Sequence, residues 1–534
     1  MPQKKSHPAR RAPRLPAWFA VFSGVLLGLA FPPVDAKWLV WAGLVPLLLA
    51  IEQSRRPRHA FLLGALAGLA FFLLTLHPLI SAHSWTGWAS ESPAAFAHRL
   101  TRQWWFMQGI WMAFSLWCAM FWGCWAALLH RLAREPGARQ LLLAPCLWVL
   151  LPEWARAQTT FGFAWAFFGN ATADLAAIRQ LAALGGVWGL SALVVLVNVG
   201  FSAVLRRRTL ARWWSAPMIA SAALVVSSIG GVVYLHRPLR HGEPFMVAAL
   251  QHHKAEYVTS DFADTGLDRS YLPLVQKALT SNVRLVVLPE SIALGAMNLD
   301  GTHSQAKPRE WEHPRSGWDA QMHALLAGTS SVLVLGIDTV EGGLDHNTLV
   351  AWTAGGPLGW YHKRRLVPFS EYQPWGWGSW AIRGRSQYFP GRESQLIRAP
   401  GMVLGGFICQ EVLFPWVTRT SVRDGATLLV TGGNDGVFQD PAVARVHADA
   451  AQLRAVETGR YIVRAMKTGI SAILDPHGRE LVRSRSSEPA LLTQQISALK
   501  EFTPYVRFGD WVVWASLLVV AASFLLPPAN NRLS

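Results

Sequence analysis

Three polar residues in the C-terminal half of the sequence each stand at the end of a predicted strand. Glu290 follows VRLVVLP, Lys363 follows GWYH, and Cys409 follows MVLGGFI. The last of these runs is short and contains glycines, which predicts a buried strand with the thiol on the turn after it. A thiol nucleophile needs a base to take its proton, and a cation or amide donors to hold an oxyanion. A glutamate, a lysine and a cysteine could supply those parts together.

The carboxyl ends of strands are where sites form in parallel α/β sheets, so we expect Glu290, Lys363 and Cys409 to converge. Each residue taken alone also has a plainer interpretation. Most free cysteines are small buried hydrophobes. Glu290 could be a solvated loop carboxylate, and Lys363 could belong to a basic surface run at residues 362–365.

The composition indicates a membrane protein that carries at least one folded domain. The 534 residues are 51% hydrophobic and only 15% charged, and 27 of them are Trp. A formal charge of +17 could indicate nucleic-acid binding, but many basic residues lie in short runs between apolar segments. We therefore expect a membrane partner and no nucleic acid. Three of the four cysteines fall in apolar segments, so no disulfide framework is expected.

Eight apolar segments predict about eight transmembrane helices. The segments cover approximately residues 18–31, 38–51, 60–80, 105–130, 139–153, 182–205, 213–235 and 509–527. The basic residues between them fall in alternate loops, which the positive-inside rule assigns to the cytoplasm. Both termini are then cytoplasmic, and residues 237–505 lie outside. Glu153 and Arg156 close the fifth segment, where we interpret them as interfacial anchors rather than residues that orient a site.

Residues 237–505 differ from the rest because predicted strands alternate there with predicted helices, as in an α/β domain. The main strands are expected near residues 245–251, 283–288, 331–337, 402–408, 427–431 and 461–465, and helices near 268–280, 318–328 and 441–458. The predicted domains are a membrane domain with seven helices (1–236), a catalytic domain (237–505), and a last transmembrane helix with a short cytoplasmic tail (506–534). An unpaired Cys409 in an oxidising compartment is a liability, which favours a catalytic role.

Longer motifs around the three residues resemble those of a known superfamily. The segments VVLPES, YHKRRLVPFSEY and GGFICQE look like the Glu–Lys–Cys triad segments of the nitrilase, or carbon–nitrogen hydrolase, superfamily. The eight-span frame, with LAFPPVDAKWLVWAGLVPLL and GFAWAFFGN, resembles the apolipoprotein N-acyltransferase family of the bacterial inner membrane. The resemblance covers nearly the whole chain and implies a nitrilase-type αββα sandwich that faces the periplasm.

The chemistry implied by the resemblance is an acyl transfer. Glu290 would be the general base, Cys409 would accept a fatty acyl chain from a phospholipid as a thioester, and Lys363 would stabilise the oxyanion. The implied acceptor is the α-amino group of diacylglyceryl-cysteine at the N-terminus of an apolipoprotein. No cofactor is expected, and no metal, because the histidines show no zinc-ligand spacing. The protein is expected to be a monomer.

Two other enzyme functions remain open at this point. One is a membrane-tethered nitrilase-type amidase or hydrolase, in which water replaces the amine, and the other is an acyltransferase with a different amine acceptor. A non-catalytic binding module fits less well because Glu290, Lys363 and Cys409 are all present.

Supporting roles are expected for residues near the three. Glu371 and Glu411 match further carboxylates of the family and could orient Lys363 or the acceptor amine; otherwise they are a loop charge and a turn hydrogen bond. Lipid phosphates could meet Arg364 and Arg365. The glycine-rich segment 374–384 predicts a lid that dips into the outer leaflet, with a packed aromatic cluster as the alternative; its tryptophans are Trp375, Trp377 and Trp380.

The pocket residues depart from the family pattern. An aromatic residue usually follows the cysteine, whereas this chain has Gln410. The family sequence Ser-Asn-Asp-Ala-Trp-Phe is replaced by GNDGVF at residues 433–438, and an Asn pair is replaced by Met-Lys-Thr at 466–468. These departures bear on the substrate more than on the type of reaction.

Overall fold

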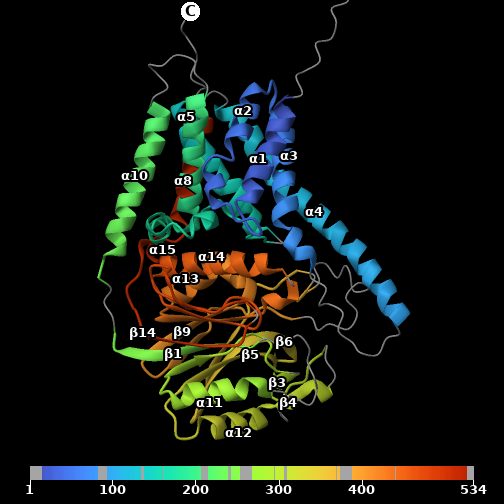
Figure 1. Cartoon of the computed structure of the whole chain (residues 1–534), viewed down its shortest axis with the longest axis vertical. Coiled ribbons are helices and arrows are strands. Elements are labelled where there is room, and N and C mark those ends of the chain that lie inside the picture. The colour runs from blue at the N-terminus through green and yellow to red at the C-terminus, as the bar shows by residue number, and fades with distance from the viewer. Residues whose placement is uncertain are drawn as a thin grey trace, which may run out of the picture.

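The computed structural model stacks a two-sheet domain on one end of a helical bundle (Figure 1). It describes residues 15–81, 93–133, 137–159, 162–205, 215–238, 242–252, 268–293, 295–305, 309–368, 370–372, 388–438, 440–486 and 488–525.

Helices occupy each of the eight apolar segments that the sequence predicts to cross the membrane. Their bounds are α1 (Leu15–Leu29), η1 (Lys37–Trp41), α2 (Val45–Gln53), α3 (Pro57–Thr75), α4 (Pro93–Ala133), α5 (Ala138–Trp148), α8 (Ala182–Leu205), α10 (Ser215–Leu235) and α16 (Trp511–Leu525). Among the described residues, four helical stretches are long and apolar enough to cross a membrane by themselves. They are Pro57–Thr75, Met107–Ala133, Ala182–Leu205 and Ala216–Leu235, so the count of eight crossings stays a prediction.

The second apolar segment is broken into η1 and α2, and Asn198 of α8 covers the break. Its side-chain Oδ1 accepts from the Leu44 backbone N–H at 2.9 Å, and its Nδ2 donates to the Val40 carbonyl at 2.9 Å. Backbone polar groups at membrane depth must find partners within the protein. One buried amide therefore satisfies both sides of the interruption.

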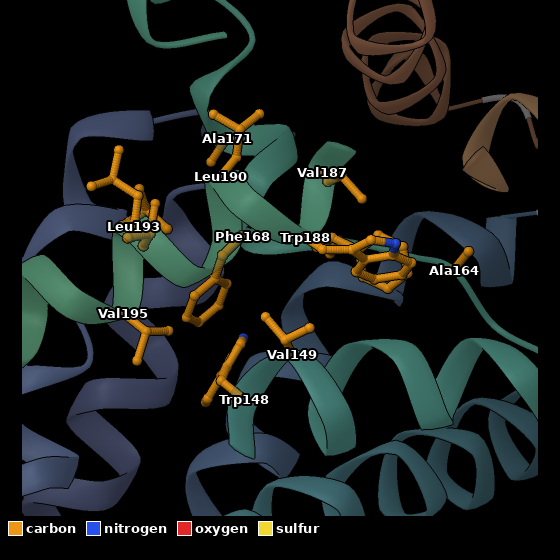
Figure 2. Packing of buried hydrophobic residues seen from close by; sticks show 14 of the residues in the cluster. Trp148, Val149, Ala164, Phe168, Ala171, Val187, Trp188, Leu190, Leu193 and Val195 are labelled. Carbon is orange, nitrogen blue, oxygen red and sulfur yellow. The ribbon is translucent and has the colours of Figure 1, made fainter. Parts of the chain in front are cut away.

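Aromatic side chains fill the centre of the bundle where α5 meets the segment around η5 (Phe168–Thr172) (Figure 2). The rings of Trp148 and Phe168 stack with centroids 4.4 Å apart. Trp122 of α4 contacts both rings edge-on. These large rings fix the helices against one another.

Glu153 and Arg156 lie inside this packing, so their interpretation as interfacial anchors is wrong. Glu153 Oε1 accepts from the Phe168 backbone N–H at 2.8 Å and from Trp148 Nε1 at 3.2 Å. Arg156 donates to the carbonyls of Phe163 and Trp165 at 2.8 and 2.9 Å. Both side chains are almost fully buried. They hold segment 163–168, which leads into η5, in place against the helices.

Two β-sheets form the core of the second part of the chain. The first sheet has the order β14-β1-β2-β5-β3-β4, with β6 added beside β5 and β7 beside β6, and the second has the order β13-β12-β11-β10-β9-β8. The first-sheet strands are β1 (Pro244–Gln251), β2 (Leu285–Val287), β3 (Ala296–Asn298), β4 (Glu312–Pro314), β5 (Val332–Glu341), β6 (Leu344–Thr353), β7 (Gly356–His362) and β14 (Ala490–Ser497). The second-sheet strands are β8 (Leu396–Ala399), β9 (Met402–Ile408), β10 (Leu428–Gly433), β11 (Ile462–Met466), β12 (Ala472–Leu474) and β13 (Glu480–Arg483).

The central strands pack on both faces. In β10, Leu428 and Val430 face the core between the sheets, whereas Leu429 faces the helices outside the second sheet. Strands β1, β2 and β5 run parallel, as do β9, β10 and β11. This two-sided burial explains why the sequence shows continuous Val/Leu/Ile runs there.

Helices cover the outer face of each sheet, which gives four layers. The first sheet is covered by α11 (Leu272–Thr280) and α12 (Arg315–Leu326), and the second by α13 (Pro415–Arg423) and α14 (Pro441–Thr458) (Figure 1). The expected helix at 441–458 is therefore observed with the same bounds. Strands β3, β4, β8 and β13, each three or four residues long, were not expected from the sequence, and neither were β14 and α13.

The α13–α14 layer also packs directly on the helical bundle. One continuous hydrophobic core runs from the bundle through α13 and α14 to the second sheet. Polar contacts reinforce this junction: Glu457 of α14 accepts from the Val187 backbone N–H at 2.8 Å, and Lys37 pairs with Asp449 at 2.9 Å. The second sheet and its helix layer are thus packed directly against the bundle.

Candidate active site

Cys409 lies on the turn between β9 and the short helix η10 (Cys409–Leu413). Its φ angle is +52°, a left-handed conformation that non-glycine residues seldom adopt. The side chain is 7% exposed and faces the core between the two sheets. The backbone N–H of Asn434, just after the neighbouring strand β10, donates to the sulfur. The turn thus presents a thiol to a nearly closed pocket with an amide donor beside it.

The structure brings Glu290 and Lys363 to this thiol. Glu290 follows β2, and Lys363 follows β7, so both residues come from the first sheet. The Lys363 Nζ lies 3.6 Å from Glu290 Oε1, and the Glu290 carboxyl group accepts a hydrogen bond from the Cys409 thiol. The three side chains predicted to converge therefore lie together in one buried cluster, in which Lys363 and Cys409 interact electrostatically.

Glu371 and Asn347 complete the polar cluster. Lys363 Nζ donates to Glu371 Oε1 at 2.7 Å, and Asn347 Nδ2 donates to both Glu290 Oε1 and Glu371 Oε1. The Lys363 ammonium is thus paired with the Glu371 carboxylate. Sequence reasoning missed Asn347. The one available signal was a run of polar residues, DHNT at 345–348, inside an otherwise apolar strand.

Burial and neighbouring charges shift the pKa values of the Cys409, Glu290 and Lys363 side chains. Burial raises the pKa of the Cys409 thiol well above its ordinary value, and Glu290 adds to that increase. Burial also raises the pKa of Glu290, although Lys363 opposes the shift. Burial alone would lower the pKa of Lys363, but Glu371 and Glu290 outweigh it and raise that pKa. Lys363 is therefore a permanent cation beside a carboxyl group and a thiol that can exchange a proton.

Glu411 clamps the nucleophile turn to the loop that carries Lys363. Its Oε2 accepts from the Ile408 backbone N–H at 2.7 Å and from the Tyr361 hydroxyl at 2.9 Å. Its Oε1 accepts from the backbone N–H groups of Arg364 and Arg365 at 2.8 and 2.9 Å. The carboxylate thus fixes two loops that are far apart in the sequence.

The two arginines after Lys363 have different surroundings. Arg364 donates to the Val417 carbonyl at 2.7 Å and to Thr420 Oγ1 at 3.0 Å, so it ties the loop to α13. The guanidinium of Arg365 instead lies over the Phe414 ring and against Gly162 of the bundle. Its Nη2 is buried and has no hydrogen-bond partner within the described ranges.

The three tryptophans expected to form a lid, Trp375, Trp377 and Trp380, lie outside the described residues. No group of three potential metal-binding side chains occurs in the part of the chain that the structure describes.

The departures from the family pattern gather at the ends of β10 and β11. A Cβ atom on Gly433 would lie 2.6 Å from Met466 Cε, and one on Gly436 would lie 2.5 Å from Thr468 Oγ1. Gly433 and Gly436 therefore leave the space that the larger side chains of Met466 and Thr468 fill. Lys467 is buried between them, where its Nζ donates to the Ser291 carbonyl at 3.1 Å and burial lowers its pKa to about 7.

Comparison with known proteins identifies both parts of the chain. The apolipoprotein N-acyltransferase N-terminal domain family matches residues 23–200, and the carbon–nitrogen hydrolase family matches residues 246–503. The latter match gives the C-terminal half the nitrilase-superfamily fold.

Three curated relatives are similar over almost their entire length, and each is named apolipoprotein N-acyltransferase. The protein from Gloeobacter violaceus is 31% identical over 96% of this chain and 94% of its own. The relative from Geobacter metallireducens is 28% identical over 96% and 95%, and that from Caulobacter vibrioides is 30% identical over 94% and 92%. The chain therefore belongs to the apolipoprotein N-acyltransferase family.

Proposed function

We propose that this protein is an N-acyltransferase of the bacterial inner membrane. It transfers a fatty acyl chain from a phospholipid, through a thioester on Cys409, to the α-amino group of diacylglyceryl-cysteine at the N-terminus of lipoproteins. The names of its relatives support this substrate pair, and the geometry of the site supports the thioester.

The observation that carries the proposal is the continuous core between the nucleophile turn and the bundle. Val412, Leu413 and Phe414, which follow Cys409 on the same turn after Gln410 and Glu411, belong to the same hydrophobic cluster as the apolar helices. The turn that carries the thiol is thereby packed, together with α13 and α14, against the bundle, which keeps the site close to the surface where the ester groups of a phospholipid would lie. A hydrolase that acts on soluble amides would need a tether to the membrane but no such packing.

In the first half-reaction, Glu290 takes the proton of Cys409 as the sulfur attacks the ester carbonyl carbon. A C–S bond forms, and the carbonyl oxygen becomes an oxyanion beside the Lys363 ammonium and the Asn434 N–H. The intermediate collapses with loss of the C–O bond. Glu290 returns its proton to the departing lysophospholipid, which leaves an acyl thioester on Cys409.

In the second half-reaction, the α-amino group of the acceptor attacks the thioester carbonyl. A C–N bond forms, the C–S bond breaks, and the ammonium proton passes through Glu290 back to the sulfur. Lys363 again faces the oxyanion. Because donor and acceptor use the same thiol in turn, the kinetics are ping-pong.

The contact with the lipid head group is assigned to Arg365. Its guanidinium lies at the junction of the bundle and the catalytic domain, and its buried Nη2 has no hydrogen-bond partner among the described residues. Arg364 is not assigned to the lipid head group, because its side-chain hydrogen bonds go mainly to α13. Phosphate oxygens would supply the acceptors that Arg365 needs. A lid that dips into the outer leaflet is the role proposed for Trp375, Trp377 and Trp380.

The proposed topology has eight crossings, cytoplasmic termini and a periplasmic catalytic domain, divided at residues 1–236, 237–505 and 506–534. His130 at the end of α4 contacts the Ser54 carbonyl, and Arg139 donates to the Ser523 carbonyl near the end of α16. These contacts gather basic loops at the end of the bundle remote from the sheets (Figure 1). Reporters fused after Arg532 and inserted near His303 should read cytoplasmic and periplasmic, respectively; the same side for both would contradict this topology.

The acceptor is tested with a diacylglyceryl-cysteine peptide and phospholipid vesicles. The expected product is the peptide with one added acyl chain, and a matched peptide with an acetylated N-terminus should gain none. Acylation of both peptides would exclude the α-amino group as the acceptor. Release of free fatty acid without acylation of either would favour the hydrolase.

A further inference from the structure

Asn347 of β6 lies between the two carboxylates of the site. Its side chain is 4% exposed, and its backbone carbonyl accepts from the Lys363 backbone N–H at 2.8 Å. Strand β6 pairs with β5 on one side and β7 on the other. This central position fixes the direction in which the amide points.

The amide of Asn347 and the ammonium of Lys363 share the same two acceptors. Asn347 Nδ2 lies 2.5 Å from Glu290 Oε1 and 3.2 Å from Glu371 Oε1. The corresponding distances from Lys363 Nζ are 3.6 and 2.7 Å. Each donor is therefore closer to a different carboxylate: Asn347 to Glu290, and Lys363 to Glu371.

This division matters because Glu290 must be ionised to act as a base, although burial disfavours its charge. A hydrogen bond to the charged form of a carboxylate favours that form. The amide nitrogen carries two hydrogens and no charge, so it can serve both carboxylates without neutralising either. A serine would offer one hydrogen, and an aspartate would add a third negative charge.

We propose that Asn347 is a positioning residue that holds the Glu290 carboxylate in its basic form and directed at Cys409. The Asn347 amide thereby leaves Lys363 paired with Glu371 and able to face the oxyanion. This inference rests on the proposed function only in taking Cys409 as the nucleophile.

The test is the pH dependence of Cys409 alkylation by iodoacetamide in the purified full-length protein, read by mass spectrometry. This reaction needs neither lipid nor lipoprotein. In Asn347→Ala, the acid limb of the rate profile should move to higher pH by about one to two units, the size expected for a lost hydrogen bond to a charged group. Asn347→Asp should move the acid limb to still higher pH, because the added carboxylate repels the charge on Glu290.

Asn298→Ala is the matched control. Asn298 is a similarly buried amide in the same sheet that also donates to a carboxylate, that of Glu312 at 2.9 Å. Within the described ranges its side-chain hydrogen bonds are with Thr302, Glu312 and Gly301 and not with the site. Its acid limb should coincide with that of the wild type. If Asn347→Ala yields too little folded protein, Asn347→Ser keeps one donor and should give a smaller shift in the same direction.

An acid limb that does not move in folded Asn347→Ala or Asn347→Ser would overturn the inference. So would an equal shift in Asn298→Ala, since the effect would then be general destabilisation. If wild-type protein transfers no acyl chain while the alkylation limb still moves with Asn347, the inference stands and the proposed function fails.

Discussion

Two buried charge clusters in this protein have the same kinds of residue but different partners. In the bundle, Glu153 and Arg156 bond mainly to backbone groups of one segment, 163–168. In the catalytic domain, Glu290, Lys363 and Glu371 contact one another, Asn347 and the Cys409 thiol. Glu153 and Arg156, whose partners are mainly backbone groups, hold that segment in place. Glu290 lies beside the Cys409 thiol, so its carboxylate can take the thiol proton, which catalysis requires.

Substitutions in the two clusters should therefore affect different properties of the protein. Altering the bundle cluster should affect stability and leave the thiol reactive. Substitutions in the catalytic cluster should change the reactivity of the Cys409 thiol more than the stability of the protein. Variants of the two clusters, and the pH dependence of acyl transfer, test this separation.

Replacing Cys409 by Ala should abolish acyl transfer, since no other group in the site can carry the thioester. The protein should still insert in the membrane, because the side chain contributes little to the core. Acyl transfer and membrane fractionation measure the two effects. Cys124→Ala is the control, as Cys124 is an exposed cysteine of α4. Wild-type turnover in Cys409→Ala would rule out the mechanism.

Replacing Glu411 by Gln should reduce acyl transfer by about 10²-fold, the cost of misplacing a reacting group. The amide keeps one acceptor oxygen, so its NH₂ group would face the N–H donors that the carboxylate now accepts from. The free energy of unfolding should fall by about 3 kcal/mol. Tyr361→Phe removes only one bond to Glu411 and should lose much less activity. Equal losses in the two variants would argue against the clamp.

The acyl-transfer rate should fall as the pH falls, with a midpoint above the ordinary glutamate range. Glu290 is a base only when deprotonated, and burial raises its pKa, so the loss begins at a higher pH than for an exposed glutamate. The pH profile of the first half-reaction measures this limb. Glu290→Gln should remove it along with most of the activity. If Glu290→Gln retained the same acid limb, the limb would have to come from the titration of another group.

Replacing Glu153 by Gln should lower stability without changing the chemistry. The backbone N–H of Phe168 and the indole N–H of Trp148 would lose a charged acceptor, at a cost of about 1–2 kcal/mol. Thermal unfolding in detergent should shift down while the Cys409 alkylation rate at fixed pH stays constant. A large fall in alkylation would mean that the two clusters are coupled and that the comparison fails.

The sequence predicts the three central site residues because each ends a strand, and strand ends gather at one edge of a parallel sheet. Asn347 could not be predicted in this way, since it lies inside β6 among other polar residues. The clamp by Glu411 joins groups up to 50 residues apart and has no local signal. Arg364 and Arg365 are adjacent and alike, so only the structure distinguishes their surroundings.

Prediction of the fold from the sequence has similar limits. Long apolar runs predict the buried helices and central strands, but strands of three or four residues carry too little pattern to be recognised. Glu153 and Arg156 were misjudged because charged residues at the end of an apolar segment usually lie at the membrane surface. Here the polypeptide turns back at residues 163–168 and covers them.

The measurement that tests the central claim most directly is the intact mass of the purified protein after incubation with phospholipid vesicles and no acceptor. We predict a fatty-acyl increment on Cys409 that hydroxylamine removes and that Cys409→Ala lacks. Absence of the increment in a protein whose Cys409 still alkylates readily would contradict the account, since a competent nucleophile would then have failed to accept the proposed donor.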